Sequence, residues 1–521
     1  MLQLAASSND QLAESVGASE PISSAIGAFT QKIMTKVKKP AIRVRLAPSP
    51  TGLFHVGTAQ SGVYNWLFAK HHNGQFILRI EDTDKERSQP QFEKDICAGL
   101  EWLGLKWDEF HRSSERQGRY RKHLEKLLAD GKAFWCYHSK EELAAESAEQ
   151  MTKKEAPKHV CSHKFEIRST KSETQHAIIR LNTEKVTDQD ISWDDMVRGE
   201  IKFALNTLGD ISLAKNLDEA LYNFAVVVDD WEMQISHVIR GEDHISNTPK
   251  QILIYLALGA VPPRFAHLPL LLGSDRSKLS KRHGSVAFSQ YIESGYTPEG
   301  MFNFLAMLGW STPGGEEVFS KNQAIEWFAM ASIHKSGAIF NPEKLNWINA
   351  HYIKQLNDEL LTDAVLPFVE KHFPAYAKAL ADRSEGRGRL REVVLKMAPL
   401  LRERLTYFDQ VKEFSYFFVM PEYETSLLIW KKGDSKKALL ALEAVEKIIE
   451  ERAKEKELKP TLDELAEEQF AGDRGMVYWP LRVALSGEKF SADPLEIINI
   501  LGGAEALKRI AYAINKLRLQ P

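Results

Sequence analysis

The sequence predicts an α/β protein in which a doubly wound parallel sheet is split by an inserted α+β domain and followed by an all-α region. Three observations support this fold class. Two stretches show the strand-loop-helix pattern of a βαβ unit, and about 100 residues separate them. The segment between them is strongly charged and irregular in pattern over residues 139–200. Strand-like runs nearly vanish after Tyr291, which indicates a helical remainder.

The first βαβ unit starts after residue 40. Apolar and basic residues alternate over 42–46, which is typical of a strand. A loop follows, then an apolar helical pattern beyond Gly57, and residues 75–80 predict a second strand. Two further helices are expected over 89–104 and 116–130, because each stretch ends at a glycine.

The second unit begins with the apolar run 224–228, which Asp229 and Asp230 follow directly. Such a run predicts a buried parallel strand whose carboxyl end meets a ligand cleft. A short strand over 235–239 and a helix over 249–258 are expected next. Together the two units predict one Rossmann-type sheet with a domain inserted between its halves.

Composition limits the functional class. The 521 residues carry 68 Lys and Arg against 71 Asp and Glu, a formal net charge of -3, so no global positive field indicates a nucleic-acid partner. Three cysteines cannot form a disulfide framework and favour a reducing compartment. No apolar run reaches the roughly 18–20 residues that span a bilayer. We expect a cytoplasmic protein without a membrane segment.

Two motifs suggest phosphate chemistry. The loop 47–58 contains His55, Gly57 and Thr58 between a strand and a helix N-terminus, where backbone N–H groups and the helix dipole favour phosphate. The segment 271–284 places three cations in five residues, and mobile lysines can neutralise a polyphosphate leaving group. Taken singly, these motifs are equally a Pro/Gly-rich turn with a surface histidine and a solvated basic loop. In this order on a split sheet they match the class I aminoacyl-tRNA synthetase arrangement.

The chain resembles the glutamyl-tRNA synthetase family from Arg43 to its C-terminus. The resemblance rests on RLAPSPTG at 45–52, HVGT at 55–58, RIEDTD at 79–84, YNFAVVVDD at 222–230, HVIRGEDH at 237–244 and KLSKR at 278–282. It implies ATP-dependent activation of L-glutamate to glutamyl adenylate with release of pyrophosphate, then transfer to the 3′ end of tRNA-Glu. It also implies Mg²⁺ on the nucleotide and a monomeric enzyme.

The resemblance assigns roles residue by residue. It gives catalysis to His55, Lys278 and Lys281, ATP binding to these three with Gly57, Thr58 and Ser280, and glutamate binding to Arg45, Ser49, Glu81, Tyr222 and Arg240. A guanidinium suits a substrate carboxylate, and Glu81 would hold the α-ammonium. The alternatives are an edge-strand cation facing water for Arg45, a solvated acid for Glu81 and ordinary core for Tyr222.

The resemblance also divides the chain. It implies a disordered extension over 1–40, a split Rossmann-type catalytic domain over 41–118 and 222–262, an inserted acceptor-end-binding domain over 119–221, a stem-contact region with the KLSKR loop over 263–357, and an all-helical anticodon-binding region over 358–521. One departure from the family lies before Tyr222, where residues 216–221 suggest a helical turn in place of a β-turn. Leu279 replaces a common Met of similar volume.

A third constellation is a pair of Cys-x-His steps. Cys136 with His138 and Cys161 with His163 can each offer two ligands to one tetrahedral Zn²⁺, because residues two apart in an extended chain face the same side. Some family members have zinc in this domain, with Cys at the position of His138. We expect one structural zinc here. The alternative is two small core or surface cysteines with incidental histidines.

Seven basic residues are candidates for RNA phosphates, although a solvated helical face is the commoner meaning of such a run. They are Arg383, Arg387, Arg389, Arg391, Lys396, Arg402 and Arg404. Three rival functions remain: a glutaminyl-tRNA synthetase, a truncated glutamyl transferase acting on a modified tRNA base, and an inactive RNA-binding paralogue. Helical spacing after residue 350 disfavours the first two, and intact His55, Lys278 and Lys281 disfavour the third. Whether tRNA-Gln is also charged is left open.

Overall fold

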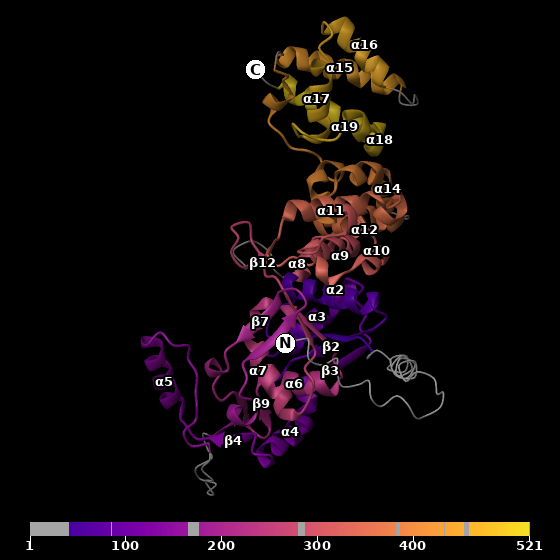
Figure 1. The fold of residues 1–521 in the computed structure, drawn as a ribbon. Coiled ribbons are helices and arrows are strands. Elements are labelled where there is room, and N and C mark those ends of the chain that lie inside the picture. The colour runs from indigo at the N-terminus through magenta and orange to yellow at the C-terminus, as the bar shows by residue number, and fades with distance from the viewer. Residues whose placement is uncertain are drawn as a thin grey trace, which may run out of the picture.

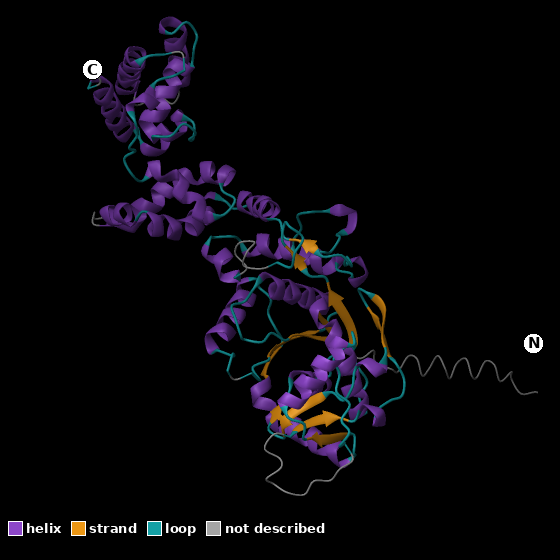
Figure 2. Cartoon of the chain, turned by 90° about the vertical axis from the view of Figure 1, so that its left-hand side faces the viewer, coloured by secondary structure: helices purple, strands orange, loops and turns teal. Residues whose placement is uncertain are grey.

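The computed structural model describes residues 41–84, 86–164, 177–279, 287–381, 386–431, 433–452 and 458–519. The predicted extension over 1–40 lies outside them. The described chain is elongated, with the mixed α/β part at one end and the helical part at the other (Figure 1). Figure 2 shows nearly all of the strands in the α/β part. Among the described residues, no helix is long and apolar enough to cross a membrane.

The first half of the sheet closely follows the prediction. Strand β1 (Arg43–Leu46) pairs in parallel with β2 (Gln75–Ile80), which pairs in parallel with β3 (Glu109–Arg112). Helix α2 (Val56–His71) connects the first two strands, and α3 (Pro90–Trp102) leads toward the third. The apolar side chains of β1, β2 and α2 are buried together, which fixes the loop between β1 and α2 against a packed core.

The second half differs from the prediction at its first element. Residues 224–228 are not a strand but belong to helix α6 (Tyr222–Glu232). An apolar run that is buried on all sides has no period to distinguish helix from strand. Strand β10 (His237–Gly241), helix α7 (Thr248–Leu258) and strand β11 (Arg264–Leu268) follow, and β10 pairs in parallel with β11. Ser236 donates its N–H to the Arg43 carbonyl at 2.9 Å, which joins the two halves.

The inserted domain has more regular structure than its charged sequence suggests. After α4 (Gln117–Ala129), an antiparallel sheet combines β4 (Ala133–Cys136), β5 (Ile178–Leu181), β8 (Ser212–Asn216) and β9 (Glu219–Ala220). Helix α5 (Lys140–Thr152) starts at a Ser139 capping box, and β6 (Ile191–Asp195) forms a hairpin with β7 (Gly199–Phe203). The helical turn expected over 216–221 is wrong, because Asn216 pairs with Glu219 across a two-residue turn.

The remainder is helical, as predicted. A two-residue strand, β12 (Leu271–Leu272), pairs with β13 (Ala338–Ile339), and helices make up the rest. The helices near the α/β part are α8 (Phe288–Glu293), α9 (Pro298–Met307), α10 (Lys321–Trp327) and α11 (Pro342–Lys354). Beyond them lie α12 (Asp358–His372), α13 (Pro374–Ala381), α14 (Gly386–Arg404), α15 (Ser435–Arg452), α16 (Lys459–Gln469), α17 (Gly475–Ser486), α18 (Pro494–Leu501) and α19 (Gly503–Arg518).

Candidate active site

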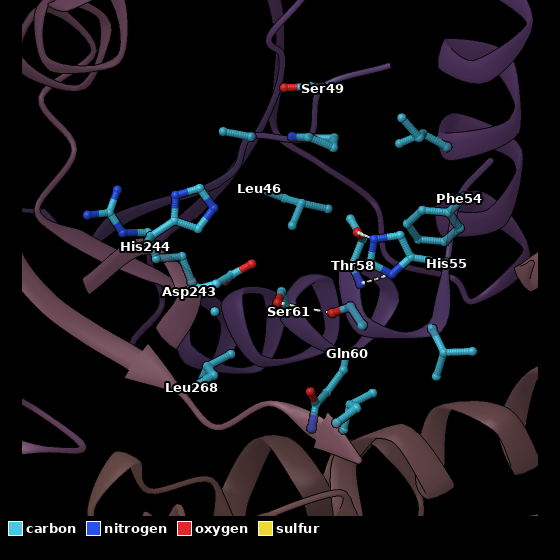
Figure 3. Close-up of a pocket in the computed structure, with 18 of the residues that line it drawn as sticks. Leu46, Ser49, Phe54, His55, Thr58, Gln60, Ser61, Asp243, His244 and Leu268 are labelled. Carbon is cyan, nitrogen blue, oxygen red and sulfur yellow. Dashed lines mark hydrogen bonds between the residues drawn. The ribbon is translucent and has the colours of Figure 1, made fainter. Parts of the chain in front are cut away.

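A cavity of about 1020 Å³ opens where β1, β10 and β11 end. Such a position beyond the carboxyl ends of strands is where doubly wound sheets bind ligands. Figure 3 shows His55 and Thr58 on one side of the cavity and Asp243 and His244 on the other. Every predicted ATP- or glutamate-binding residue that the structure describes lines this cavity: Arg45, Ser49, His55, Gly57, Thr58, Glu81, Tyr222, Arg240 and Lys278.

His55 occupies the N-cap of α2. Its Nδ1 accepts the backbone N–H of Thr58 at 3.3 Å, and its Nε2 lies 3.0 Å from the Thr58 hydroxyl. Its position inside the cavity and the positive charge of Lys278 lower the pKa of His55. The first turn of α2 contains no acidic residue, so its backbone N–H groups and the helix dipole face the cavity without a competing carboxylate from that turn.

The structure describes the loop that carries the KLSKR motif only up to Leu279 and again from Ala287. Lys278 lies 3.6 Å from Asp243, Nζ to Oδ2, and its side chain is 64% exposed. Ser280 and Lys281 lie outside the described residues. Leu279 and Ala287, the nearest described residues on either side, both line the cavity, and Ala287 forms a β-bridge with His55. The chain therefore enters and leaves this loop at the cavity wall.

Arg45 and Glu81 are connected by a buried chain of charges. Arg45 is 3% exposed, and its Nε donates to Oδ1 of Asp230 at 3.0 Å. The same oxygen accepts Nη1 of Arg79 at 2.7 Å, and Nη2 of Arg79 donates to Oε1 of Glu81 at 3.1 Å. The alternatives of a water-facing cation for Arg45 and a solvated acid for Glu81 are therefore wrong.

The two carboxylates in this chain are held differently. Burial outweighs the attraction of Arg79 and Arg45 and raises the pKa of Glu81. For Asp230 burial also opposes ionisation, but Arg45 and Arg79 together outweigh it and lower the pKa. The negative charge of Asp230 is thus balanced by arginines of the protein, whereas the negative charge of Glu81, which lines the cavity, is balanced less fully. A cation in the cavity would supply the missing charge.

Arg240 and Tyr222 complete the wall opposite α2. The Tyr222 hydroxyl lies 3.2 Å from Nδ1 of His244, and burial raises the pKa of Tyr222 to about 12, so it is neutral at pH 7. Arg240 is 7% exposed; its Nε donates to Nε2 of His267 at 3.2 Å and its Nη2 to Oγ1 of Thr248 at 2.8 Å. Its Nη1 has no hydrogen-bond partner among the described residues, as expected of a donor reserved for a ligand.

Sequence reasoning did not assign roles to several residues that build this site. Arg79 and Asp230 lie within quoted motifs, but only the structure shows that they join Arg45 to Glu81. His267 stands outside every motif, and nothing in the sequence indicates its contact with Arg240. The two-residue spacing of Arg79 in β2 and Glu81 just after its end is the one signal that was available.

A Cys/His cluster lies in the inserted domain. Cys136, His138, His159 and Cys161 place one ligand atom each within 4.8 Å of one another. Sγ of Cys136 is 3.5 Å from Nδ1 of His138 and 3.5 Å from Nε2 of His159. A tetrahedral Zn²⁺ with ordinary bond lengths separates a sulfur and a nitrogen ligand by about 3.5 Å. Two thiols and two imidazoles at this spacing fit zinc.

The fourth member of this cluster corrects the sequence prediction. His159 takes the place expected for His163, whose ring lies beside that of His138 with 5.3 Å between centroids. Nδ1 of His159 contacts Oε2 of Glu146 at 2.6 Å, the carboxylate support that zinc-binding histidines commonly have. Burial opposes ionisation of Cys136, but hydrogen bonds from His159 and His138 lower its pKa to about 6, which favours a thiolate.

Several basic residues of α14 form ion pairs within the protein. Arg391 pairs with Glu359 and Asp363, Lys396 with Glu392, and Arg402 with Asp358. Arg389 and Arg404 are exposed. Arg383 and the side chain of Arg387 lie outside the described residues. The candidates for RNA contact among the described residues therefore narrow to Arg389 and Arg404.

Comparison with known proteins agrees with this geometry. Residues 41–347 match the family model of the catalytic domain of class I tRNA synthetases (E and Q), and residues 360–514 match that of an anticodon binding domain. A glutamate-tRNA ligase of Aquifex aeolicus is 40% identical over 483 residues, covering 91% of this chain and 99% of its own. One from Hydrogenobaculum is 45% identical over 377 residues, covering 70% and 80%.

A solved structure is similar throughout. The crystal structure of a glutamate tRNA ligase from Elizabethkingia meningosepticum, in complex with its amino acid, superposes with a TM-score of 0.78 at 32% identity, covering 91% of this chain and 99% of that one. The α/β part with its cavity and the helical part are both included in this match. The chain therefore belongs to the class I family of glutamyl- and glutaminyl-type tRNA synthetases.

Proposed function

We propose that the chain is a glutamate-tRNA ligase, which activates L-glutamate with ATP and transfers it to the 3′ end of tRNA-Glu. One observation carries this proposal. A single cavity combines a phosphate-binding end, made by His55 at the N-terminus of α2 and by Lys278, with an amino-acid end made by Arg45, Arg240 and Glu81. The relatives named glutamate-tRNA ligase support the choice of amino acid.

The amino-acid end matches the charges of glutamate. Glu81 accepts the α-ammonium group, and the unpartnered Nη1 of Arg240 donates to a carboxylate. Arg45 supplies a second guanidinium, which Asp230 holds in place from behind. Glutamine would present a neutral amide to a buried guanidinium, so the site loses charge pairing when it binds glutamine.

The phosphate end stabilises the leaving pyrophosphate. The glutamate α-carboxylate attacks the α-phosphorus of ATP in line, and the bond to the β-phosphate oxygen breaks. The first-turn N–H groups of α2, His55 and Lys278 lie where charge grows on the phosphate oxygens, and Lys281 follows Lys278 in the same loop. Mg²⁺, when bound with the nucleotide, neutralises phosphate charge. The protein then positions the terminal ribose hydroxyl of tRNA to attack the acyl carbon of glutamyl adenylate, which forms the ester and releases AMP; no protein nucleophile is required.

We assign the tRNA to three further regions. The inserted domain over 119–221 receives the acceptor end, residues 263–357 contact the stem, and the helices after 358 bind the anticodon. The match of residues 360–514 to an anticodon binding domain supports the last assignment. We propose that the enzyme acts in the cytoplasm as a monomer.

The function is tested by aminoacylation with purified tRNA-Glu and tRNA-Gln, each with glutamate and with glutamine. We expect tRNA-Glu to be charged with glutamate and not with glutamine. Charging of tRNA-Gln with glutamate would widen the tRNA specificity without changing the amino acid. Charging with glutamine would refute the proposal, and so would the absence of both charging and tRNA-supported pyrophosphate exchange, which would favour an inactive RNA-binding paralogue.

Two matched variants test the pocket itself. Arg45→Gln replaces a buried charge with a neutral group, and the glutamate KM should rise at least about tenfold, since a charge-assisted hydrogen bond contributes about 1.5–3 kcal/mol. Arg43→Gln is the control, because Arg43 lies on the same strand and bonds to Glu109 outside the cavity. Equal effects of the two substitutions on the glutamate KM would contradict the assignment.

We also propose that Cys136, His138, His159 and Cys161 hold one structural Zn²⁺. Four protein ligands leave no open coordination position, so the ion would stabilise the inserted domain and take no part in the reaction. Cys136 is the last residue of β4, and His138 lies just after it. Cys161 donates its N–H to Asp210, which precedes β8. The ion would thus tie the end of β4 to the segment that precedes β8.

A further inference from the structure

The guanidinium of Arg240 is supported by a histidine and a carboxylate from two other parts of the chain. Its Nε donates to Nε2 of His267 on β11, and Nδ1 of His267 lies 2.5 Å from Oδ2 of Asp195. Arg240 is on β10, whereas Asp195 ends β6 in the inserted domain. The side chains of His267 and Asp195 are both 0% exposed. A buried line therefore connects the inserted domain to the candidate glutamate site.

The contacts define which nitrogen of His267 carries the proton. Nε2 faces the Nε–H of Arg240, which is always a donor, so Nε2 must be the acceptor. Nδ1 faces a carboxylate oxygen and must be the donor. The ring is then neutral, and burial, opposed by Asp195 and reinforced by Arg240, lowers the pKa of His267 in agreement. Oγ1 of Thr248 accepts from Nη2 of Arg240, which fixes a second edge of the guanidinium. The same Oγ1 lies 3.0 Å from Nε2 of His267, so in this tautomer the Thr248 hydroxyl donates to Nε2.

Asp195 is itself held rigidly. Its Oδ1 accepts the backbone N–H groups of Val197, Arg198 and His267 at 3.0 to 3.1 Å. Its Oδ2 contacts the imidazole and also accepts the indole N–H of Trp193 at 3.4 Å. Met196 donates its N–H to the Phe265 carbonyl at 2.9 Å, so the hairpin tip is also bonded to β11 through its backbone. These bonds fix both the position and the orientation of the carboxylate.

We propose that Asp195 and His267 are positioning residues for glutamate binding. Asp195 holds His267 as the neutral tautomer with its proton on Nδ1, the Nε2 lone pair holds the Nε–H of Arg240, and Nη1 of Arg240 is thereby presented to the substrate. The proposal rests on the function proposed above, because it takes Arg240 to contact glutamate.

Asp195→Asn tests the tautomer directly. Three backbone N–H groups require an oxygen at the Oδ1 position, so the new amide places its NH₂ at the Oδ2 position, facing His267. The NH₂ donates to Nδ1, the imidazole proton moves to Nε2, and two N–H groups then face each other between His267 and Arg240. The glutamate KM should rise about 30-fold or more, with the ATP KM within about threefold of wild type.

The experiment is aminoacylation of tRNA-Glu by the full chain, comparing Asp195→Asn and four further variants with wild type. Asp194→Asn is the matched control, because Asp194 is exposed on the same strand. His267→Gln keeps an acceptor near the Nε2 position and should restore much of the affinity, whereas His267→Leu should not. Asp195→Asn in the His267→Gln background should have a much smaller effect, because no tautomer remains to be inverted.

The outcomes separate this inference from the proposed function. Failure of the wild-type chain to charge tRNA-Glu would overturn the function. An active wild type whose glutamate KM is unchanged in Asp195→Asn would overturn the inference alone. A fall in kcat and a rise in both KM values to the same extent in Asp195→Asn and His267→Gln would also overturn it, because that pattern indicates only a structural role.

Discussion

Replacing Arg79 by Met should destabilise the α/β domain in a strongly pH-dependent way. Arg79 is 0% exposed and contacts three carboxylates: Asp230 at 2.7 Å, Glu81 at 3.1 Å and Asp229 at 3.8 Å. Asp230 keeps Arg45 after the substitution, and Asp229 keeps Arg116. The charge left without its nearest partner is that of Glu81.

Protonation of Glu81 limits how much stability the Arg79→Met substitution can remove. Removing one partner of a buried ion pair costs about 3–5 kcal/mol. Glu81 can escape this cost by taking up a proton, which for an ordinary glutamate costs about 3.7 kcal/mol at pH 7 and about 1 kcal/mol at pH 5. The pKa of Glu81 is already raised in the wild type, so protonating it there costs less than for an ordinary glutamate. We expect a loss of about 3 kcal/mol at pH 7 and less than about 1 kcal/mol at pH 5 from this source.

The direction of the pH dependence follows from the raised pKa of Glu81. Glu81 has a folded-state pKa above its unfolded value, so folding favours its protonated form, and the associated loss of stability grows as pH rises. Removing Arg79 raises this pKa further, and the variant should therefore approach wild-type stability on acidification. Urea unfolding at pH 7 and pH 5 measures this, using the transition that ATP shifts to higher urea to identify the α/β domain.

Arg87→Met is the matched control. Arg87 pairs with Asp84 at 2.6 Å on the loop after β2, but its side chain is 74% exposed, and exposed pairs contribute little to stability. A loss in Arg79→Met that equals that of Arg87→Met would refute the reasoning. So would a large loss that is the same at both pH values, because it would arise from packing and not from the charge of Glu81.

Three further outcomes are expected. Gly99→Ala should destabilise the α/β domain by about 1–3 kcal/mol and raise the ATP KM, since a Cβ would lie 2.4 Å from Cδ1 of Phe54 next to the phosphate loop; thermal unfolding and steady-state kinetics measure both effects. His159→Ala should lose the zinc expected in the wild type, whereas His163→Ala should retain it, as metal analysis of the three proteins would show; the reverse pattern would restore the prediction from the sequence. Lys278→Ala should lower the rate of adenylate formation about 10²-fold without changing tRNA affinity; single-turnover kinetics and filter binding distinguish this from a lysine that contacts RNA.

The sequence predicted elements well where local pattern decides the structure. The alternation over 42–46 identifies β1, and the mostly apolar stretch 75–80 identifies β2. The run 224–228 was assigned wrongly because the carboxylates after it looked like a strand end at a cleft. In the structure Asp229 and Asp230 are buried inside α6 and paired with arginines that are distant in the sequence.

Side-chain partners across the fold were harder to predict than the site itself. Motifs located all the cavity-lining candidates that the structure describes. His159 and His163 are equally spaced on either side of Cys161, so spacing could not choose between them. The choice depends on contacts from distant segments: the His159 carbonyl accepts the N–H of Asp210 at 2.7 Å, and Glu146 holds its ring.

The hairpin contact at Asp195 limits how freely the inserted domain can be exchanged between related enzymes. The Arg198 side chain donates to the carbonyls of His267 and Lys335 and pairs with Glu242, so the hairpin tip contacts both the sheet and the region after it. A chimaera that joins a foreign insertion at residues 119 and 221 would exchange Asp195 but keep His267. Such grafts should preserve amino-acid recognition only when the donor brings an equivalent carboxylate, so the functional boundary of the catalytic unit includes the tip of this hairpin.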